Sequence, residues 1–242
     1  KPDYLEFFDN QVERAIHKQR MFKPDDRIMV GVSGGKDSLT LWDFLLRMEY
    51  DVTALHIHLG IGEYSNHSHS TTVKFAEERG APLITVDLAE QYGMGVPELS
   101  QAIRRVPCSG CGLSKRYILN KEAYDRDFTV VAMGHNLDDE AATLMGNVLH
   151  WDMGALARQS PSLPTNREKL IKRVKPLYTV TEREVAANAI LRGIEYVEEE
   201  CPNSVGARSI MYKNALDQIE AQSPGTKHAF FSIFLDRIRP VM

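Results

Sequence analysis

The octapeptide Gly31-Val32-Ser33-Gly34-Gly35-Lys36-Asp37-Ser38 says more about the fold of this chain than any other segment. It follows an apolar run, Arg27–Val30, and precedes an amphipathic helical pattern, Ser38–Leu46. A strand, a glycine-rich turn and a helix N-terminus together cradle phosphate. Glycine lets the backbone approach the anion, N–H groups point at it, and the helix dipole favours negative charge. Lys36 adds a positive charge, and Ser33 and Ser38 add hydroxyl donors. The octapeptide is not a Walker A loop, which requires G-x-x-x-x-G-K-[ST].

The same residues resemble the SGGxDS signature of the PP-loop, or N-type, ATP pyrophosphatases. That resemblance implies an enzyme that splits ATP between the α and β phosphates and passes AMP to a substrate oxygen. The loop would hold the departing pyrophosphate, with Lys36 as a catalytic residue. By the same resemblance, the ATP-binding residues of the loop are Gly31, Val32, Ser33, Gly34, Gly35, Lys36, Asp37 and Ser38.

The composition is that of an ordinary globular protein. The chain has 242 residues, of which 43% are hydrophobic and 26% charged, so it can bury a substantial core. Its net charge of −4 provides no overall attraction to nucleic acid, so any RNA contact must come from local basic patches. No apolar run approaches the roughly 20 residues that span a bilayer. Three cysteines cannot all pair internally, which suits a reducing compartment, and we therefore expect a cytoplasmic protein.

Apolar strand-like runs alternate with helical patterns along most of the chain. We expect strands over 27–32, 52–58, 82–88 and 129–133, and helices over 38–48, 69–79, 96–104, 113–124 and 137–149. Nearly continuous apolar strands separated by helices predict an α/β fold, a parallel sheet with helices on both faces. Ligands of such sheets bind beyond the carboxyl ends of the strands, where the motifs of this chain fall.

The two ends of the chain are expected to be helical. An amphipathic pattern predicts a helix over about 4–20, and the segment 160–165 is expected to be a loop. A basic extended segment, 167–178, comes next. Thr181-Glu182-Arg183-Glu184 resembles a capping box that opens a helix to about Arg192. Further helices are expected over about 204–221 and 228–237. We therefore divide the chain into an N-terminal helix (1–26), a PP-loop domain (27–203) and a C-terminal helical extension (204–242).

The cysteines form the second motif. Cys108 and Cys111 stand in a C-x-x-C sequence, and Cys201 lies far along the chain between glutamates and Pro202. Two thiolates at this spacing can hold a metal or cluster or cycle as a redox pair. Three thiolates and a histidine, His58 or His135, would complete a zinc site. Three thiolates alone would hold a [4Fe–4S] cluster with one iron open, and a persulfide relay is the rival.

The order of PP-loop, C-x-x-C-G and distant Cys-Pro resembles the tRNA 2-thiolation enzymes, and the chain is most similar to TtuA-type tRNA 2-thiouridine synthetases. Three further segments resemble the same family: His58–Ser65, Lys115–Tyr117 and Gly134–Glu140. The resemblance favours a [4Fe–4S] cluster on Cys108, Cys111 and Cys201 over the persulfide relay. The sequence differs from that family in one respect. The family normally carries a zinc ribbon at each end, and this sequence has no flanking C-x-x-C pairs that could form them.

The resemblance also implies a reaction. A uridine C2 carbonyl oxygen would attack the α-phosphorus of ATP, pyrophosphate would leave, and sulfur would then displace AMP to give 2-thiouridine. Lys36 and Mg²⁺ would stabilise the pyrophosphate, with Asp37 as an indirect metal partner. Asp138 is the first choice for a catalytic carboxylate and Asp139 the second, although an acidic first turn also complements a helix dipole.

Other residues are expected to line the nucleotide site or to remain outside it. By the resemblance, Gly134 and His135 border the nucleotide, and His56 and Ile57 lie where the fold places adenine. Four histidines cluster in this part of the sequence: His56, His58, His67 and His69. We expect them to be solvated groups of a polar loop rather than a metal site.

The expected partner is tRNA, with sulfide or a sulfur-carrier protein as the donor and a homodimer as the assembly. Candidate RNA contacts are Arg104, Arg105, Lys115, Arg116, Arg167, Lys169, Lys172, Arg173 and Lys175. The alternation over 169–175 predicts a half-buried strand with a basic face. Three alternatives share the fold: a synthetase with a nitrogen nucleophile, a non-catalytic ATP-binding Fe–S sensor, and an enzyme that acts on a free base or small metabolite.

Overall fold

One mostly parallel sheet organises the chain. The structure, a computed structural model, describes residues 2–104, 107–163, 165, 168–204 and 208–242. Within these ranges the sheet has the order β3-β2-β1-β4-β6-β5. Its strands are β1 (Ile28–Val32), β2 (Val52–His58), β3 (Leu83–Asp87), β4 (Val130–Met133), β5 (Ser162–Leu163) and β6 (Lys172–Val174). All neighbours pair in parallel except β5 and β6.

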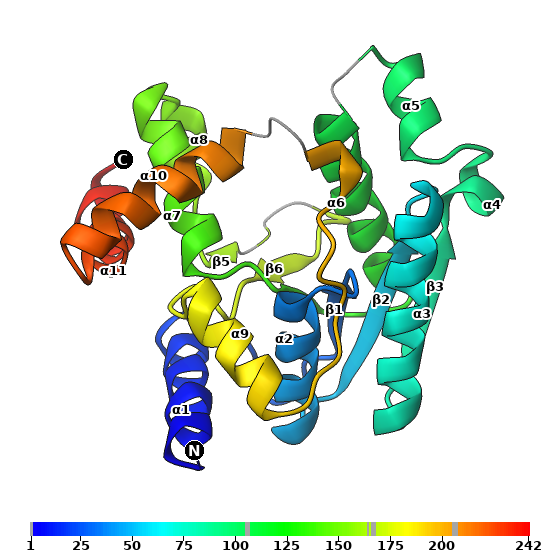
Figure 1. The fold of residues 1–242 in the computed structure, drawn as a ribbon, viewed down its shortest axis with the longest axis horizontal. Helices are drawn as coiled ribbons and strands as arrows, with labels where there is room; N and C mark the ends of the chain where they lie inside the picture. The colour runs from blue at the N-terminus through cyan, green and yellow to red at the C-terminus, as the bar shows by residue number, and fades with distance from the viewer. Residues whose placement is uncertain (1, 105–106, 164, 166–167, 205–207) are drawn as a thin grey trace.

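Helices surround this sheet (Figure 1). They are α1 (Pro2–Lys18), α2 (Lys36–Arg47), α3 (Gly62–Arg79), α4 (Leu88–Tyr92), α5 (Val96–Ala102), α6 (Pro107–Asp125), α7 (Leu137–Leu149), α8 (Met153–Arg158), α9 (Glu182–Leu191), α10 (Arg208–Gln222) and α11 (Thr226–Ile233). Short 3-10 turns cover Pro202–Ser204 and Arg239–Val241, and a π turn covers Phe234–Ile238. No helix among the described residues is long and apolar enough to cross a membrane.

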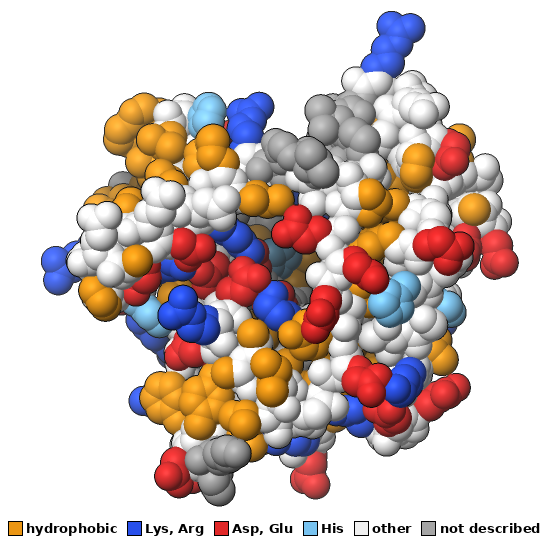
Figure 2. Space-filling view, in the orientation of Figure 1, with side chains coloured by type: hydrophobic (Ala, Val, Ile, Leu, Met, Phe, Trp, Pro, Cys, Tyr) orange, Lys and Arg blue, Asp and Glu red, His pale blue; other side chains and the backbone are white. Residues whose placement is uncertain are grey.

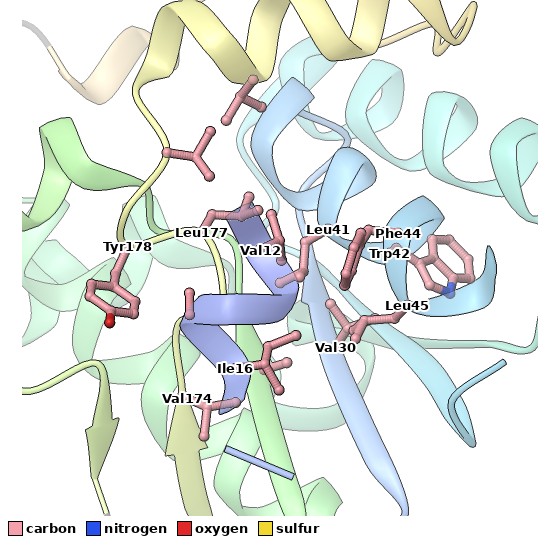
Figure 3. Close-up of a cluster of buried hydrophobic side chains, with 14 of the residues drawn as sticks. Val12, Ile16, Val30, Leu41, Trp42, Phe44, Leu45, Val174, Leu177 and Tyr178 are labelled. Carbon is pink, nitrogen blue, oxygen red and sulfur yellow. The ribbon is translucent and has the colours of Figure 1, made fainter. Parts of the chain in front are cut away.

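The sheet has an apolar core on each face, as the nearly unbroken apolar strands predict. Val30 of β1 points into the larger core, where it meets Leu41 and Leu45 of α2 and Ile16 of α1 (Figure 3). Met29, its neighbour in β1, points to the opposite face and packs with residues of β2 and α6. Successive side chains of a strand face opposite sides, so one short strand contributes to both cores. The expected α/β sheet with helices on both faces is confirmed.

Several expected element boundaries were wrong. Helix α3 begins at Gly62 and not at 69, so His67 and His69 lie on a helix and not in a polar loop. Helix α6 begins at Pro107 and not at 113, so the C-x-x-C backbone is helical. Of the described part of the expected extended segment, residues 168–178, only Lys172–Val174 forms a strand, where it pairs with β4. Two short helices, α4 and α8, and strand β5 had no periodic pattern to reveal them.

The last two helices pack against α7 and not away from the sheet domain. Tyr212 of α10 lies against Gly146 of α7, where a Cβ would come within 2.8 Å of its ring. Phe231 of α11 is buried in the larger core, where its ring contacts that of Tyr178. Figure 1 shows α10 crossing α7 beside α11. The C-terminal helices therefore lie next to the loop that follows β4.

Candidate active site

The loop after β1 is shaped to cradle an anion. Gly34 has a φ of +73°, and a Cβ there would lie 2.8 Å from the carbonyl oxygen of Ser68, so only glycine fits. Ser38 Oγ accepts a hydrogen bond from Ser33 N at 3.1 Å and donates one to Gly35 O at 3.0 Å. No described side chain caps α2, whose first N–H groups therefore face the loop. This is the cradle that the octapeptide predicts.

Gly134 allows a second loop to press against the cradle. A Cβ on Gly134 would come within 2.9 Å of both the nitrogen and the Cα of Ser38. Strand β1 pairs with β2 on one side and with β4 on the other, and the chain reverses direction across the sheet between them. Such a reversal opens a crevice at the carboxyl ends of the strands. The loops that follow β1 and β4 meet at that crevice.

A cavity of about 620 Å³ occupies the crevice. Its apolar lining comes from Leu55, Ile57, Leu59, Leu119 and Met133. Its charged lining consists of four basic and two acidic side chains, Lys115, Arg116, Arg173, Lys175, Asp37 and Asp139. Figure 2 shows a hollow near the middle of this face, with acidic and basic side chains gathered round it. An apolar floor with a cationic wall suits a flat base joined to phosphates.

Charged side chains from four helices meet beside the cradle. Lys36 Nζ lies 2.8 Å from Glu182 Oε1, at the start of α9. The other oxygen, Glu182 Oε2, lies 3.1 Å from Lys213 Nζ of α10. Lys213 Nζ in turn lies 2.6 Å from Asp139 Oδ1, in the first turn of α7. These contacts join the cradle lysine to the acidic motif.

Two further residues close these contacts into a ring, which we call the polar ring. Asn136 Nδ2 donates to Asp37 Oδ1 at 3.0 Å, and Asp37 Oδ2 lies 3.3 Å from Lys36 Nζ. Asn136 and Asp139 form the capping box of α7, with both hydrogen bonds at 3.1 Å. The polar ring therefore consists of Lys36, Asp37, Asn136, Asp139, Lys213 and Glu182.

The polar ring shifts the titration of its members. Burial alone would raise the pKa of Glu182, but the Lys36 hydrogen bond and the charges of Lys213 and Lys36 lower that pKa to about 2. Burial raises the pKa of Asp37 despite the nearby charge of Lys36. Burial would lower the pKa of Lys36, but Asp37 and Glu182 outweigh it, so this pKa is raised. Lys36 is therefore charged and paired with carboxylates, and an incoming anion would compete with these carboxylates for it.

The two adjacent aspartates have different surroundings. Asp138 is 6% exposed, forms an ion pair with Lys227 of α11, and accepts a hydrogen bond from Glu182 N at 2.7 Å. Asp139 lines the cavity instead. Successive residues of a helix point about 100° apart, so only one of the pair can face the crevice. The structure places Asp139 there, the residue ranked second from the sequence.

Two of the three expected cluster ligands come together. Cys111 of α6 and Cys201, next to the Pro202–Ser204 turn, pack against the same apolar cluster and are half-buried. Tyr64 packs against the same apolar cluster, and burial, followed by Cys201 and Cys111, raises its pKa. The side chain of Cys108 lies outside the described residues. Soft thiolates in an apolar setting suit an iron–sulfur cluster.

The thiol of Cys201 lies beside the nucleotide-sized cavity. A second cavity of about 560 Å³ is lined by Cys201 and Lys36, and it shares Gly35, Asp37 and Tyr64 with the first. The described side chains bring no histidine to the two thiols in a metal-holding group of three. His58 instead lies 3.0 Å from Asp87.

The expected nucleotide neighbours divide into two groups. Ile57, Gly134 and His135 line the larger cavity, whereas His56 is 2% exposed and turns to the opposite face of β2. There, His56 Nδ1 lies 3.2 Å from Val32 O. Burial, and then His69, lower the pKa of His56 to about 4, so it is neutral near pH 7. Burial, followed by the charge of Lys175, also lowers the pKa of His135.

The expected RNA contacts are spread more widely than one basic patch. Lys115, Arg116, Arg173 and Lys175 line the cavity, and Lys172 instead donates to the carbonyl oxygens of Arg20 and Met21. Arg104 and Lys169 are exposed outside the cavity. Arg105 and Arg167 lie outside the described residues.

Two members of the polar ring, Glu182 and Lys213, were not predicted from the sequence. Both follow the last strand of the sheet along the chain. Glu182 had only the neighbouring capping box as a signal, which predicts a helix start and no role in binding. Lys213 stands in an ordinary helical pattern with no motif around it. Tyr64 and Ser68 were also missed, because their helix was expected to begin after them.

Comparisons with known proteins agree with this geometry. A family model described as the PP-loop domain matches residues 6–208. The tRNA-5-methyluridine(54) 2-sulfurtransferase of Thermus thermophilus is 54% identical over 98% of this chain and 74% of that protein. The enzyme of the same name from Pyrococcus horikoshii is 46% identical, over 97% and 74%. The solved U34-tRNA thiolase NcsA of Methanococcus maripaludis, with its [4Fe-4S] cluster, superposes with a TM-score of 0.87 at 28% identity. That match covers 100% of this chain and 82% of that one.

Proposed function

Because this chain belongs to the PP-loop family and, within it, to the tRNA 2-sulfurtransferases, we propose that it converts a tRNA uridine to 2-thiouridine at the expense of ATP. The observation that carries the proposal is the juxtaposition of an anion cradle, the carboxylate of Asp139 and the thiol of Cys201 around two cavities that share lining residues. ATP chemistry and sulfur chemistry then meet at one place. The family expected from the sequence motifs is confirmed.

We propose one orientation for ATP in the larger cavity. The adenine would lie on the apolar floor near Ile57, and the phosphates would lie against the cradle and the N-terminus of α2. Lys36 would exchange its contacts with Asp37 and Glu182 for the leaving pyrophosphate, with Mg²⁺ sharing the negative charge. Positioning and charge neutralisation supply most of the rate in such phosphorus chemistry.

Asp139 is the carboxylate that we assign to the chemistry. When the uridine C2 oxygen attacks the α-phosphorus, the bond from that phosphorus to pyrophosphate breaks and the N3 proton must leave. Asp139 lines the cavity and can accept that proton, whereas Asp138 is buried beside Lys227 and does not line the cavity. The sulfur nucleophile then attacks C2, and AMP leaves with the former carbonyl oxygen.

Cys108, Cys111 and Cys201 would hold a [4Fe–4S] cluster, since the two thiols with described side chains pack against one apolar cluster and Cys201 lines the second cavity. When bound, the cluster supplies an iron without a protein ligand, where sulfur for transfer can be carried. The three thiolates would hold the cluster at the side of the molecule where Cys201 lines the second cavity. This ligand set also favours thiolation over a nitrogen nucleophile, which has no use for three cysteines.

The target nucleoside follows from the names of the relatives. Two proteins at 54% and 46% identity are named for 5-methyluridine 54, whereas the solved structure named for U34 is 28% identical. We therefore propose 5-methyluridine 54 as the substrate. Sulfide or a sulfur-carrier protein would be the donor, a homodimer the assembly and the cytoplasm the compartment. Residues 1–26, 27–203 and 204–242 remain our proposed division of the chain.

The experiment that tests the proposal uses protein purified and reconstituted without oxygen. Iron and sulfide are quantified, and the protein is incubated with ATP, Mg²⁺, sulfide and tRNA that contains 5-methyluridine 54. We expect about four irons and four sulfides per chain. We also expect AMP and pyrophosphate that depend on tRNA, and a 2-thio nucleoside on digestion of the tRNA. Matched tRNA lacking the target nucleoside is the control.

The alternatives give other results. A sensor would bind ATP without forming AMP. A nitrogen-nucleophile synthetase would form AMP equally well after Cys201→Ala, and it would leave no sulfur in the RNA. If the protein were colourless and still thiolated tRNA, a persulfide relay would be favoured over the cluster mechanism. An enzyme for a free base or metabolite would turn over without tRNA.

A further inference from the structure

Lys213 is the member of the polar ring that comes from the C-terminal helix α10 and belongs to neither sequence motif. Its side chain is 25% exposed, and its Nζ contacts Asp139 and Glu182. Burial would lower the pKa of Lys213, but Asp139 and Glu182 raise it, so the ammonium stays charged. It lines neither of the two cavities described above. Its contacts are therefore with other protein groups and not with a ligand in those cavities.

The orientation of Asp139 depends on both of its carboxylate oxygens. Oδ2 accepts from Asn136 N in the capping box, and Oδ1 meets Lys213. A carboxylate held by one oxygen can still rotate, whereas two contacts on different oxygens leave one orientation. Lys213 is thus what fixes the face that Asp139 presents to the cavity.

Lys213 also compensates a charge that binding would uncover. Lys36 and Lys213 share the carboxylate of Glu182, at 2.8 and 3.1 Å. When Lys36 turns to pyrophosphate, Glu182 would lose one of its two cations near a developing negative charge. Lys213 remains on Glu182 and keeps it paired, which lowers the cost of releasing Lys36.

We propose that Lys213 is a positioning residue for the adenylation step: it orients Asp139 and retains Glu182 while Lys36 binds the leaving pyrophosphate. This inference rests on the proposed function and extends it to the C-terminal helices. A small misplacement of a reacting group costs about a hundredfold in rate, so the effect is expected in kcat. ATP binding should change little, because Lys213 does not line the nucleotide cavity.

The test compares Lys213→Met and Lys213→Arg with the unaltered protein in the tRNA-dependent formation of AMP. Lys18→Met is the matched control, since it removes an exposed lysine 3.1 Å from Asp236 of the same C-terminal region. We expect Lys213→Met to lower kcat about 10- to 100-fold and to change the KM for ATP less than about threefold. Lys213→Arg, which keeps the charge, should recover most of kcat, and Lys18→Met should match the unaltered protein.

The melting temperature and the ATP dissociation constant of each variant are measured alongside kcat. A Lys213→Met protein with unchanged kcat, or with a loss confined to KM, would overturn the inference and leave the proposed function intact. Equal losses in the Met and Arg variants would also overturn it, since charge would then be irrelevant. If the unaltered protein forms no AMP with tRNA, the proposed function fails and this inference fails with it.

Discussion

At the scale of single residues, position within a helix turn separates function from support. Asp138 and Asp139 are neighbours in the first turn of α7, and both are acidic groups near a helix N-terminus. One is buried against Lys227, and the other faces the cavity with a capping-box bond and Lys213. The same acidic group therefore forms an internal ion pair at one position and faces the cavity at the next.

This difference predicts opposite effects for two matched substitutions. Asp139→Asn should lower tRNA-dependent AMP formation about 10²- to 10⁴-fold, the usual contribution of a proton acceptor. Its loss of stability should be the smaller of the two, because an amide oxygen can keep the capping-box bond and Lys213 keeps Glu182 as a partner. Asp138→Asn should mainly destabilise the fold, by up to about 3–5 kcal/mol, because it removes a buried partner of Lys227. Urea denaturation and initial rates measure the two effects. The reverse pattern would assign the chemistry to Asp138.

At the scale of elements, close packing between the loop after β4 and the start of α2 shapes the nucleotide site. Gly134 is the residue that permits it, since any side chain would meet Ser38 backbone atoms at 2.9 Å. The N-cap residue of α2, Gly35, makes no side-chain capping hydrogen bond, and the polar ring lies directly beside this helix start. A shift of either element would separate the cradle from Asp139.

We predict that Gly134→Ala weakens ATP binding at least about tenfold and destabilises the protein by about 1–3 kcal/mol, the usual cost of forced packing. Calorimetric titration with ATP and urea denaturation provide the two measurements. Gly154→Ala is the control, because the atoms nearest to a Cβ there lie at 3.5 Å, an ordinary contact, and alanine favours its helix. Unchanged ATP affinity in Gly134→Ala would contradict the close-packing account.

At the scale of the whole molecule, a buried histidine ties stability to pH. His56 lies between β1 and α3, where Thr72 and His69 face it and the more distant His58 and Lys115 add positive charge. Its Nε2 finds no hydrogen-bond partner among the described groups. The pKa of His56 is about 4 in the folded protein, whereas a histidine side chain free in water has a pKa of 6.5.

The unfolded chain therefore binds this proton first as the pH falls. The contribution of His56 to the free energy of unfolding is fully present above pH 6.5. It is lost as the pH falls to about 4, at up to about 1.4 kcal/mol per pH unit. His56→Asn should remove that slope, while His17→Asn, at an exposed position of α1, should keep it. Urea denaturation between pH 4 and 7 gives the free energies of unfolding. Parallel slopes for His56→Asn and the unaltered protein would exclude this role.

The motifs and periodicities of the sequence were sufficient for the parallel sheet, the cradle after β1 and the family, because glycine turns and apolar strands impose local geometry wherever they occur. They could not show that α3 and α6 begin earlier than their apolar patterns, or that β6 joins the sheet, since pairing with distant strands decides those ends. Nor could they rank Asp138 against Asp139 or find Glu182 and Lys213. Those assignments depend on which side chains approach one another across 31 to 146 positions of the chain, and the packing of α9, α10 and α11 against α7 and the cradle brings them together.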